Sequence, residues 1–414
     1  MRRAVRTWLV GTAVLAAACA PPWVGLFGGR GIGDMYLYRL YAHRMERGLW
    51  PYHGFFFDWA PGSVPPVLAP VWLPGPYYVA FHVLMFVYAS LALGALAVAL
   101  VLLGAGPRRL YLAVVAAAVV PFALGAIAID SLDYWPALFT TAGIAALLAD
   151  RNRLGLGLLG FAVVAKIYAL VMVPVALIWL WRRRGRSETL RAVGVGAAVV
   201  VLAALPFLIV GPTGLGFSVW IQFKRGLQME SLGASILMAL DHLGIHPAHV
   251  VATNEPYSLD VTGGLARAVG ALSTLVTVLA LLWIYDRYRR GPDVPQRLVT
   301  ASAAAVVAYV AFGRVLSPQY LVWLIPLVPL VAGRAGVVGT GLLIAAGGVT
   351  MTWFPGRFWH LVHVSDVSWF VLLRNLLLVG LFAAVATALP ASGRAVRAST
   401  RPAGTRAATG TPPP

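Results

Sequence analysis

The chain has little charge, and little of that charge is negative or carried by lysine. Only 14 of its 414 residues are acidic, charged residues make up 11% of the chain, and hydrophobic residues make up 60%. Of the 32 basic residues, all but Lys166 and Lys224 are arginine. Soluble domains carry about 25% charged residues. The composition therefore excludes an ordinary soluble enzyme and predicts an all-α, polytopic integral membrane protein.

Other features that the sequence lacks exclude further classes of protein. Cysteine occurs once, at Cys19, which rules out an internal disulfide. Neither common glycine-rich nucleotide loop occurs, which argues against an ATPase and against a soluble nucleotide-sugar site. No internal repeat is evident, so nothing supports the inverted halves that many transporters contain.

The most prominent feature of the chain is its long apolar runs. A membrane-spanning helix needs about 20 mainly apolar residues, and the runs that approach or reach this length are Thr7–Phe27, Tyr77–Leu103, Leu110–Ile129, Trp135–Ala149, Leu190–Val210, Gly263–Tyr285, Leu298–Phe312, Ala335–Phe354 and Val367–Leu389. We expect about a dozen hydrophobic segments in a membrane domain of residues 1–389. Residues 390–414 are rich in Arg, Thr, Ala, Gly and Pro, which predicts a disordered basic tail. Met1–Pro21 also resembles a signal peptide, but the many spans that follow favour a retained first span.

The net charge of +18 is concentrated in arginine clusters at the ends of the apolar runs. This is the positive-inside pattern, with added attraction to anionic lipid, so we expect the lipid bilayer as partner and no nucleic acid. With the clusters in the cytoplasm, both termini are cytoplasmic, and Gly31–Pro76 and Gly211–Thr262 lie outside. Leu154–Trp181 is too short for two full spans and predicts a hairpin of short helices that turns near Lys166.

The first outer segment predicts a helix that lies in the membrane interface, with Asp34 at its head. Its apolar residues share one face and its charged residues the other: Tyr38, Tyr41, Ala42, Met45 and Leu49 against Arg39, His43, Glu46 and Arg47. Asp34 is the leading candidate for a general base, because a carboxylate in a partly apolar site has its pKa raised toward the useful range. The alternative is an N-cap for the helix.

Other unusual polar residues fall on the same predicted outer face. Arg225 and its neighbour Lys224 break the charge rule, so either they hold a phosphate or Arg225 pairs with Glu230. Asp130 and Asp133 stand at the mouth of a span, where they either share an acceptor pocket or cap the helix that follows. The residues leave both alternatives open.

Two further cations and two histidines need an explanation. Lys166 lies inside an apolar run, where a charge faces a functional cavity, pairs with a carboxylate or extends to the interface. Arg314, a second outer cation, has the same interpretations. His360 and His363 have the i, i+3 spacing of two metal ligands, but no third ligand is evident nearby, which favours an interfacial pair of histidines.

Several short motifs together resemble the C-type glycosyltransferases (GT-C fold), and more narrowly the actinobacterial polyprenyl-phosphate-mannose-dependent mannosyltransferases. The resemblance covers roughly residues 32–330. It is carried by Gly33-Asp34, Gly48-Leu49-Trp50-Pro51-Tyr52, Asp58-Trp59-Ala60-Pro61-Gly62, Lys166-Ile167-Tyr168-Ala169-Leu170, Arg225-Gly226-Leu227-Gln228-Met229-Glu230-Ser231 and Ser317-Pro318-Gln319-Tyr320-Leu321-Val322-Trp323.

This resemblance implies a multi-span enzyme whose first outer loop carries the catalytic acid, a position that Asp34 matches. It implies transfer of a sugar, mannose, from a polyprenyl-phosphate donor to a glycan or glycolipid acceptor at the extracytoplasmic face of the cell membrane. Gln319 and Tyr320, in the last motif, then join the substrate-binding candidates. Some relatives carry two adjacent acids, whereas here Met35 follows Asp34. One carboxylate is a poor site for a hard cation, so we expect no divalent metal and no other cofactor.

The rival interpretation is a transporter or flippase of a lipid-linked or small anionic substrate. It would use the same buried cations without a catalytic base. The absence of repeats and the large first outer segment argue against it.

Overall fold

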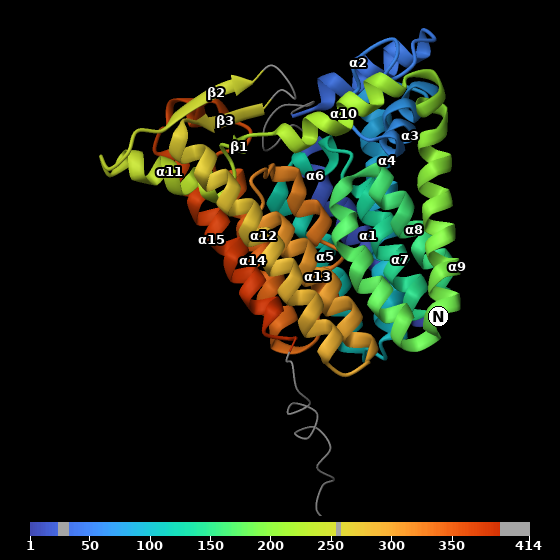
Figure 1. The fold of residues 1–414 in the computed structure, drawn as a ribbon. Helices are drawn as coiled ribbons and strands as arrows, with labels where there is room; N and C mark the ends of the chain where they lie inside the picture. The colour runs from blue at the N-terminus through green and yellow to red at the C-terminus, as the bar shows by residue number, and fades with distance from the viewer. Residues whose placement is uncertain (24–32, 254–257, 390–414) are drawn as a thin grey trace, which may run out of the picture.

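The computed structural model describes residues 1–23, 33–253 and 258–389, and most of them are helical (Figure 1). Among the described residues, eight helical segments are long and apolar enough to cross a membrane: α1 (Arg2–Trp23), α4 (Tyr77–Leu102), α5 (Pro107–Leu124), α9 (Val173–Val210) with the preceding η3 (Ile167–Met172), α12 (Gly264–Arg290), α13 (Pro295–Phe312), α14 (Gly333–Met351) and α15 (Val367–Ala386). Within α9, Gly185 leaves the helical conformation, with φ 70° and ψ −173°, so α9 consists of two helices that join at a kink. Shorter apolar helices are α7 (Tyr134–Leu148), α8 (Asn152–Ala165), α11 (Leu232–His242) and the segment Pro318–Leu330. The predicted polytopic helical fold, with about a dozen hydrophobic segments, is confirmed.

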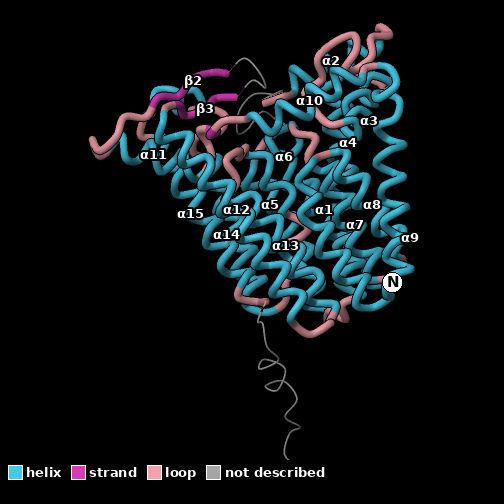
Figure 2. The backbone as a smooth tube through the Cα atoms, in the orientation of Figure 1, coloured by secondary structure: helices cyan, strands magenta, loops and turns pink. Residues whose placement is uncertain are grey.

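The remaining elements are short: α2 (Met35–Glu46), η1 (Pro61–Ser63), α3 (Val64–Leu68), η2 (Ala69–Trp72), α6 (Ile127–Asp130), α10 (Pro212–Lys224), η4 (Pro318–Leu324), η5 (Val328–Leu330) and η6 (Phe358–His363). Three strands, β1 (Leu227–Gln228), β2 (His249–Thr253) and β3 (Ser258–Thr262), form an antiparallel sheet in the order β1-β3-β2. Figure 2 shows this sheet as the strand-containing part of an otherwise helical molecule. From the sequence, this region was predicted only as an outer loop.

The bundle has two distinct ends. The α2 end carries α2, α10 and the small sheet, and the N-terminal end carries the start of α1 and the end of α15 (Figure 1). Helix α1 packs into the bundle, and the Trp8 indole Nε1 donates to the Ser90 carbonyl of α4 at 2.8 Å. The predicted tail, residues 390–414, lies outside the described residues. The structure thus places the two large polar segments of the sequence at the same end.

Helix α2 has the predicted amphipathic pattern over its first two turns, but it ends at Glu46, so that Leu49, predicted on the apolar face, lies beyond the helix and is exposed. Met35, Tyr38, Tyr41 and Ala42 are buried, and the Tyr38 ring stacks on Phe81 of α4 with centroids 5.2 Å apart. Stacked aromatic rings of this kind add to the free energy gained by burial. This packing holds the N-terminal end of α2 against the bundle.

The chain reverses at Lys166, as the segment length predicts. Helix α8 ends at Ala165, and Lys166 is extended with φ −160° and ψ 126°. The carbonyl of Ala165 that this break frees accepts a hydrogen bond from the Ser63 hydroxyl at 2.7 Å. A Cβ at Gly62 would lie 2.8 Å from the Ala165 nitrogen, so only glycine permits this approach. The first polar segment therefore rests on the tip of the hairpin.

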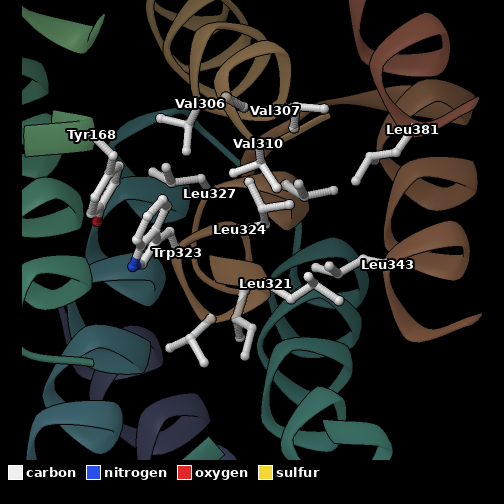
Figure 3. Close-up of a cluster of buried hydrophobic side chains, with 14 of the residues drawn as sticks. Tyr168, Val306, Val307, Val310, Leu321, Trp323, Leu324, Leu327, Leu343 and Leu381 are labelled. Carbon is white, nitrogen blue, oxygen red and sulfur yellow. The ribbon is translucent and has the colours of Figure 1, made fainter. Parts of the chain in front are cut away.

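Helix α13 forms the centre of the core and is buried along nearly its whole length. Its residues are mostly Ala, Ser and Val, whose small side chains let neighbouring helices approach closely. Val306 and Val310 face Leu324 and Leu327, which follow in the chain (Figure 3). Because this packing fixes η4 in the bundle, the residues at its beginning are held firmly at the α2 end.

Candidate active site

Asp34 directly precedes α2, and its side chain reaches η4 rather than the helix backbone. A carboxylate oxygen of Asp34 accepts a hydrogen bond from Gln319 Nε2 at 3.3 Å. The Gln319 side chain is in turn hydrogen-bonded to the Ser317 hydroxyl. Asp34 makes no side-chain capping bond to α2. Asp34 thus occupies the N-cap position of α2 without a side-chain capping bond, and its carboxylate faces Gln319 instead.

The surroundings of Asp34 are both apolar and charged. Burial raises the pKa of the Asp34 carboxyl, and the negative charge of Asp133 adds to the rise, while the positive charges of Lys166 and Arg225 oppose it. These residues come from separate elements: the loop before α7, the hairpin tip and the end of α10. The folded chain thus surrounds one carboxylate with charges of both signs.

Asp58 is a second carboxyl in the same cluster. Burial raises its pKa to about 6, and the negative charge of Asp34 adds to that rise, while the positive charges of Arg225 and Lys166 oppose it. Gln222 Nε2, on α10, donates to the Asp58 carbonyl at 3.3 Å. The sequence analysis used Asp58 only as part of a motif and missed it as a candidate residue. The signal was available, because Asp58 is a further acid in the first polar segment.

Arg225 follows the last residue of α10, and its positive charge opposes the raised pKa of both Asp34 and Asp58. Its Nε is buried and has no hydrogen-bond partner within the described residues. Among the described residues, Arg225 and Glu230 form no ion pair, so the alternative of an intramolecular pair is wrong. Lys224 is exposed, and its Nζ lies 5.3 Å from the centroid of the Trp220 ring. Arg225 is therefore the cation of this pair that the fold turns toward Asp34.

Arg314 supports the end of α10 from the neighbouring segment. Its Nη2 donates to the Phe223 carbonyl at 2.6 Å. Phe223 lies in the last turn of α10, where carbonyls lack helical partners and the helix dipole favours a positive charge. Arg314 thus has a protein partner and fixes the backbone that leads into Arg225.

Lys166 pairs with a carboxylate, one of the interpretations that its sequence context allowed. Its Nζ lies 2.6 Å from an oxygen of Asp133, and the same oxygen accepts a hydrogen bond from Trp323 Nε1 at 2.5 Å. Asp133 makes no capping bond to α7. The ammonium also lies 5.3 Å from the centroid of the Tyr320 ring, within the range of a cation–π interaction. Tyr320 and Lys166 therefore face the same part of the site.

Glu230 and Asp130 lie deeper. Burial raises the pKa of Glu230 to about 8, against the opposing charges of Arg374 and Arg225. Arg374 of α15 is fully buried, and its Nη2 donates to the Glu230 carbonyl at 2.9 Å. Asp130 is hydrogen-bonded to His82 of α4. The sequence analysis missed Arg374, although an arginine inside an apolar run was the signal.

His360 and His363 lie in η6, away from α2 in the chain. In the ranges that the structure describes, no group of three or more His, Cys, Asp or Glu side chains is arranged to hold a metal ion. The expectation that the protein uses no divalent metal stays a prediction.

No protein-family model matches the sequence, and no curated protein matches it. The fold is similar to that of the crystal structure of ArnT from Cupriavidus metallidurans bound to undecaprenyl phosphate, with a TM-score of 0.51 over 92% of this chain and 76% of that chain. The two sequences are 13% identical. At this identity the likeness shows a shared fold.

Proposed function

We propose that the protein is a membrane glycosyltransferase that moves a sugar, mannose, from a polyprenyl-phosphate donor to a glycan or glycolipid acceptor. The observation that carries the proposal is the convergence of Asp34, from the first polar segment, with Arg225, from the second, at one end of the bundle. The shared fold with ArnT, whose structure contains undecaprenyl phosphate, supports a lipid-phosphate donor. The choice of mannose rests on the motif resemblance.

The arrangement supports a direct displacement. The acceptor hydroxyl oxygen bonds to the anomeric carbon, and its proton passes to the Asp34 carboxylate. The bond between the anomeric carbon and the phosphate oxygen breaks, and its electron pair leaves with the polyprenyl phosphate. Arg225 stabilises the charge that grows on this phosphate. A raised pKa suits Asp34 to the proton transfer, because a general base works best with a pKa near the operating pH.

The other residues of the cluster would hold the two substrates. Asp58 offers hydrogen-bond acceptors to sugar hydroxyls, and the Tyr320 ring offers a face on which a sugar can stack. Lys166, held by Asp133, adds positive charge on the donor side, and no step needs a metal. Gln319 acts by orienting the Asp34 carboxylate.

The proposal is tested by a transfer assay with the purified protein in membranes. Polyprenyl-phosphate mannose should give a mannosylated glycan or glycolipid, whereas a nucleotide-activated mannose should give none. A sealed-vesicle assay with the same labelled donor serves as the comparison. Passage of the donor across the bilayer without a transfer product would refute a glycosyltransferase and favour the transporter.

We propose that the α2 end faces the extracytoplasmic side and that both termini are cytoplasmic, because the arginine clusters gather at the N-terminal end. A His53→Cys variant tests this orientation, since His53 is exposed near α2 and the native Cys19 is buried. An impermeant thiol reagent should label His53→Cys in intact cells. Labelling only after permeabilisation would reverse the orientation.

A further inference from the structure

Gln228, in β1, is buried and forms an unusually complete set of hydrogen bonds. Its Nε2 donates to a carboxyl oxygen of Glu230 at 3.1 Å, and its Oε1 accepts from the Leu316 amide at 2.9 Å. Its backbone nitrogen donates to the Arg314 carbonyl at 3.0 Å. One side chain thus joins two stretches of chain that are far apart in sequence.

The first stretch is Arg225–Ser231, which we call the strap and which connects α10 to α11. The strap begins at the proposed phosphate-binding residue and is fixed at its other end by α15. The Glu230 carbonyl accepts hydrogen bonds from Arg374 Nη2 at 2.9 Å and from Asn375 Nδ2 at 3.1 Å. Between these two points, the Gln228 side chain connects the strap to Leu316 of a neighbouring segment.

The second stretch is the 313–319 segment, which connects α13 to η4. It ends at Gln319, whose Nε2 donates to Asp34 at 3.3 Å. The amide that Gln228 binds, Leu316 N, lies three residues before Gln319 in the chain. Arg314, in the same segment, also holds Phe223, just before the strap. The 313–319 segment therefore holds Asp34 at one point and the strap at others.

We propose that Gln228 is a positioning residue that sets the place of Arg225 relative to Asp34, an inference that rests on the proposed function. In the proposed reaction, the anomeric carbon must lie between the base and the phosphate-binding cation. A misplacement of about 1 Å in such a geometry costs about 10²-fold in rate. The amide suits this role because it donates through one atom and accepts through the other. Neither a carboxylate nor an apolar side chain does both.

The test compares two glutamine-to-methionine variants. Gln228→Met keeps most of the side-chain volume but leaves the buried Leu316 amide without its acceptor. Gln296→Met is the matched control, because Gln296 also bonds through both ends of its amide, to the Leu330 carbonyl at 2.9 Å and from Arg109 Nη2 at 3.2 Å. We expect Gln228→Met to lower kcat about 10²-fold and to change the affinity for undecaprenyl phosphate by less than about tenfold. Gln296→Met should leave both quantities near the wild-type values.

A double-mutant cycle with Arg225→Ala tests the mechanism. If Gln228 acts through Arg225, Gln228→Met should reduce kcat far less in the Arg225→Ala protein than in the wild type, because coupled residues are not additive. Equal losses in the two backgrounds would overturn the inference. Equal losses in Gln228→Met and Gln296→Met would also overturn it, since that result indicates general destabilisation.

Hydrogen exchange separates a failure of this inference from a failure of the proposed function. Gln228→Met should raise exchange in both the strap and the 313–319 segment, and Gln296→Met should raise it in neither. This readout needs no turnover. Unchanged exchange in either stretch would overturn the coupling even in an active enzyme, whereas a wild-type protein without transfer activity would refute the proposed function alone.

Discussion

The two ends of the bundle treat charge differently. At the N-terminal end, arginines pair with acids in contacts that solvent reaches: Arg153 with Glu188 at 2.9 Å, Arg183 with Asp293 at 2.9 Å, Arg184 with Asp150 at 2.8 Å and Arg290 with Asp286 at 2.8 Å. At the α2 end, the positive charge of Arg225 opposes the rise that burial causes in the pKa of Asp34 and of Asp58, yet among the described residues none of the three belongs to an ion pair.

This difference in how charges are paired indicates a different role for each end of the bundle. Exposed pairs contribute little to stability, typically about 0–1 kcal/mol, and arginines at helix ends fit a role in orienting the protein in the membrane. Partly buried charges that lack an oppositely charged group in direct contact cost free energy. Such an arrangement is expected where a charged ligand completes the cluster, which is the role that we propose for the α2 end.

The largest expected effect is the loss of transfer rate on substitution of Asp34, and it tests whether the α2 end is a reaction site. Asp34→Asn keeps the size and the hydrogen bond to Gln319 but removes the basicity. We expect donor binding to survive and the transfer rate to fall about 10²–10⁴-fold, the usual loss of general-base catalysis. The measurement is turnover beside donor binding in thermally intact protein. Near-normal turnover would remove Asp34 from the chemistry and direct attention to Asp58 or Asp133.

The next largest expected effect is on the affinity for the donor. We compare the substitution of one arginine at the α2 end with that of one arginine at the N-terminal end. Arg225→Ala should weaken binding of the polyprenyl-phosphate donor about 10–100-fold, as expected for a lost hydrogen bond between charged groups. Arg225→Lys should retain only part of the wild-type donor affinity, because lysine lacks the forked geometry of the guanidinium group. Arg184→Ala is the matched control, and donor titrations should show wild-type affinity for it. Unchanged affinity in Arg225→Ala would exclude this residue from the phosphate site.

Glu230 gives a smaller effect that depends on pH. Burial raises its pKa from the ordinary 4.5 to about 8, so between these values the folded protein binds more protons at this site than the unfolded chain does. Stability from this group therefore falls as pH rises through that window. We expect Glu230→Gln to flatten the fall in Tm of the detergent-solubilised protein between pH 4.5 and about pH 8. An equal change in Tm over this range in the wild type and in Glu230→Gln would contradict a raised pKa at Glu230.

The smallest expected effect is on stability, from a substitution at the N-terminal end of the bundle. Arg153→Ala breaks the pair with Glu188, in which the arginine side chain is 53% exposed. We expect thermal unfolding to shift very little, because water and salt screen a pair that is this exposed, and we expect transfer activity to stay unchanged. A large loss of activity in Arg153→Ala would show that the two ends are coupled more tightly than their charges indicate.

Much of the fold was predictable because membrane helices follow simple rules of length and hydrophobicity. The runs that became α4, α12 and α15 were evident, as were the buried face of α2 and the chain reversal at Lys166. The small sheet was missed because its strands are short and depend on pairing between distant residues. Of the alternatives left open at the site, the structure decided those that rest on contacts: neither Asp34 nor Asp133 makes a side-chain capping bond, and Lys166 pairs with Asp133.

Local composition was enough to predict the class of the protein, the positions of most spans and the separation of arginine-rich ends from polar segments. Which polar residues meet depends on how the helices pack together. Asp34 and Gln319 are 285 residues apart, and Gln228 and Leu316 are 88 residues apart. Contacts of that kind depend on how helices such as α13 pack, and hydrophobic patterns do not specify which loop a given helix brings to a given site.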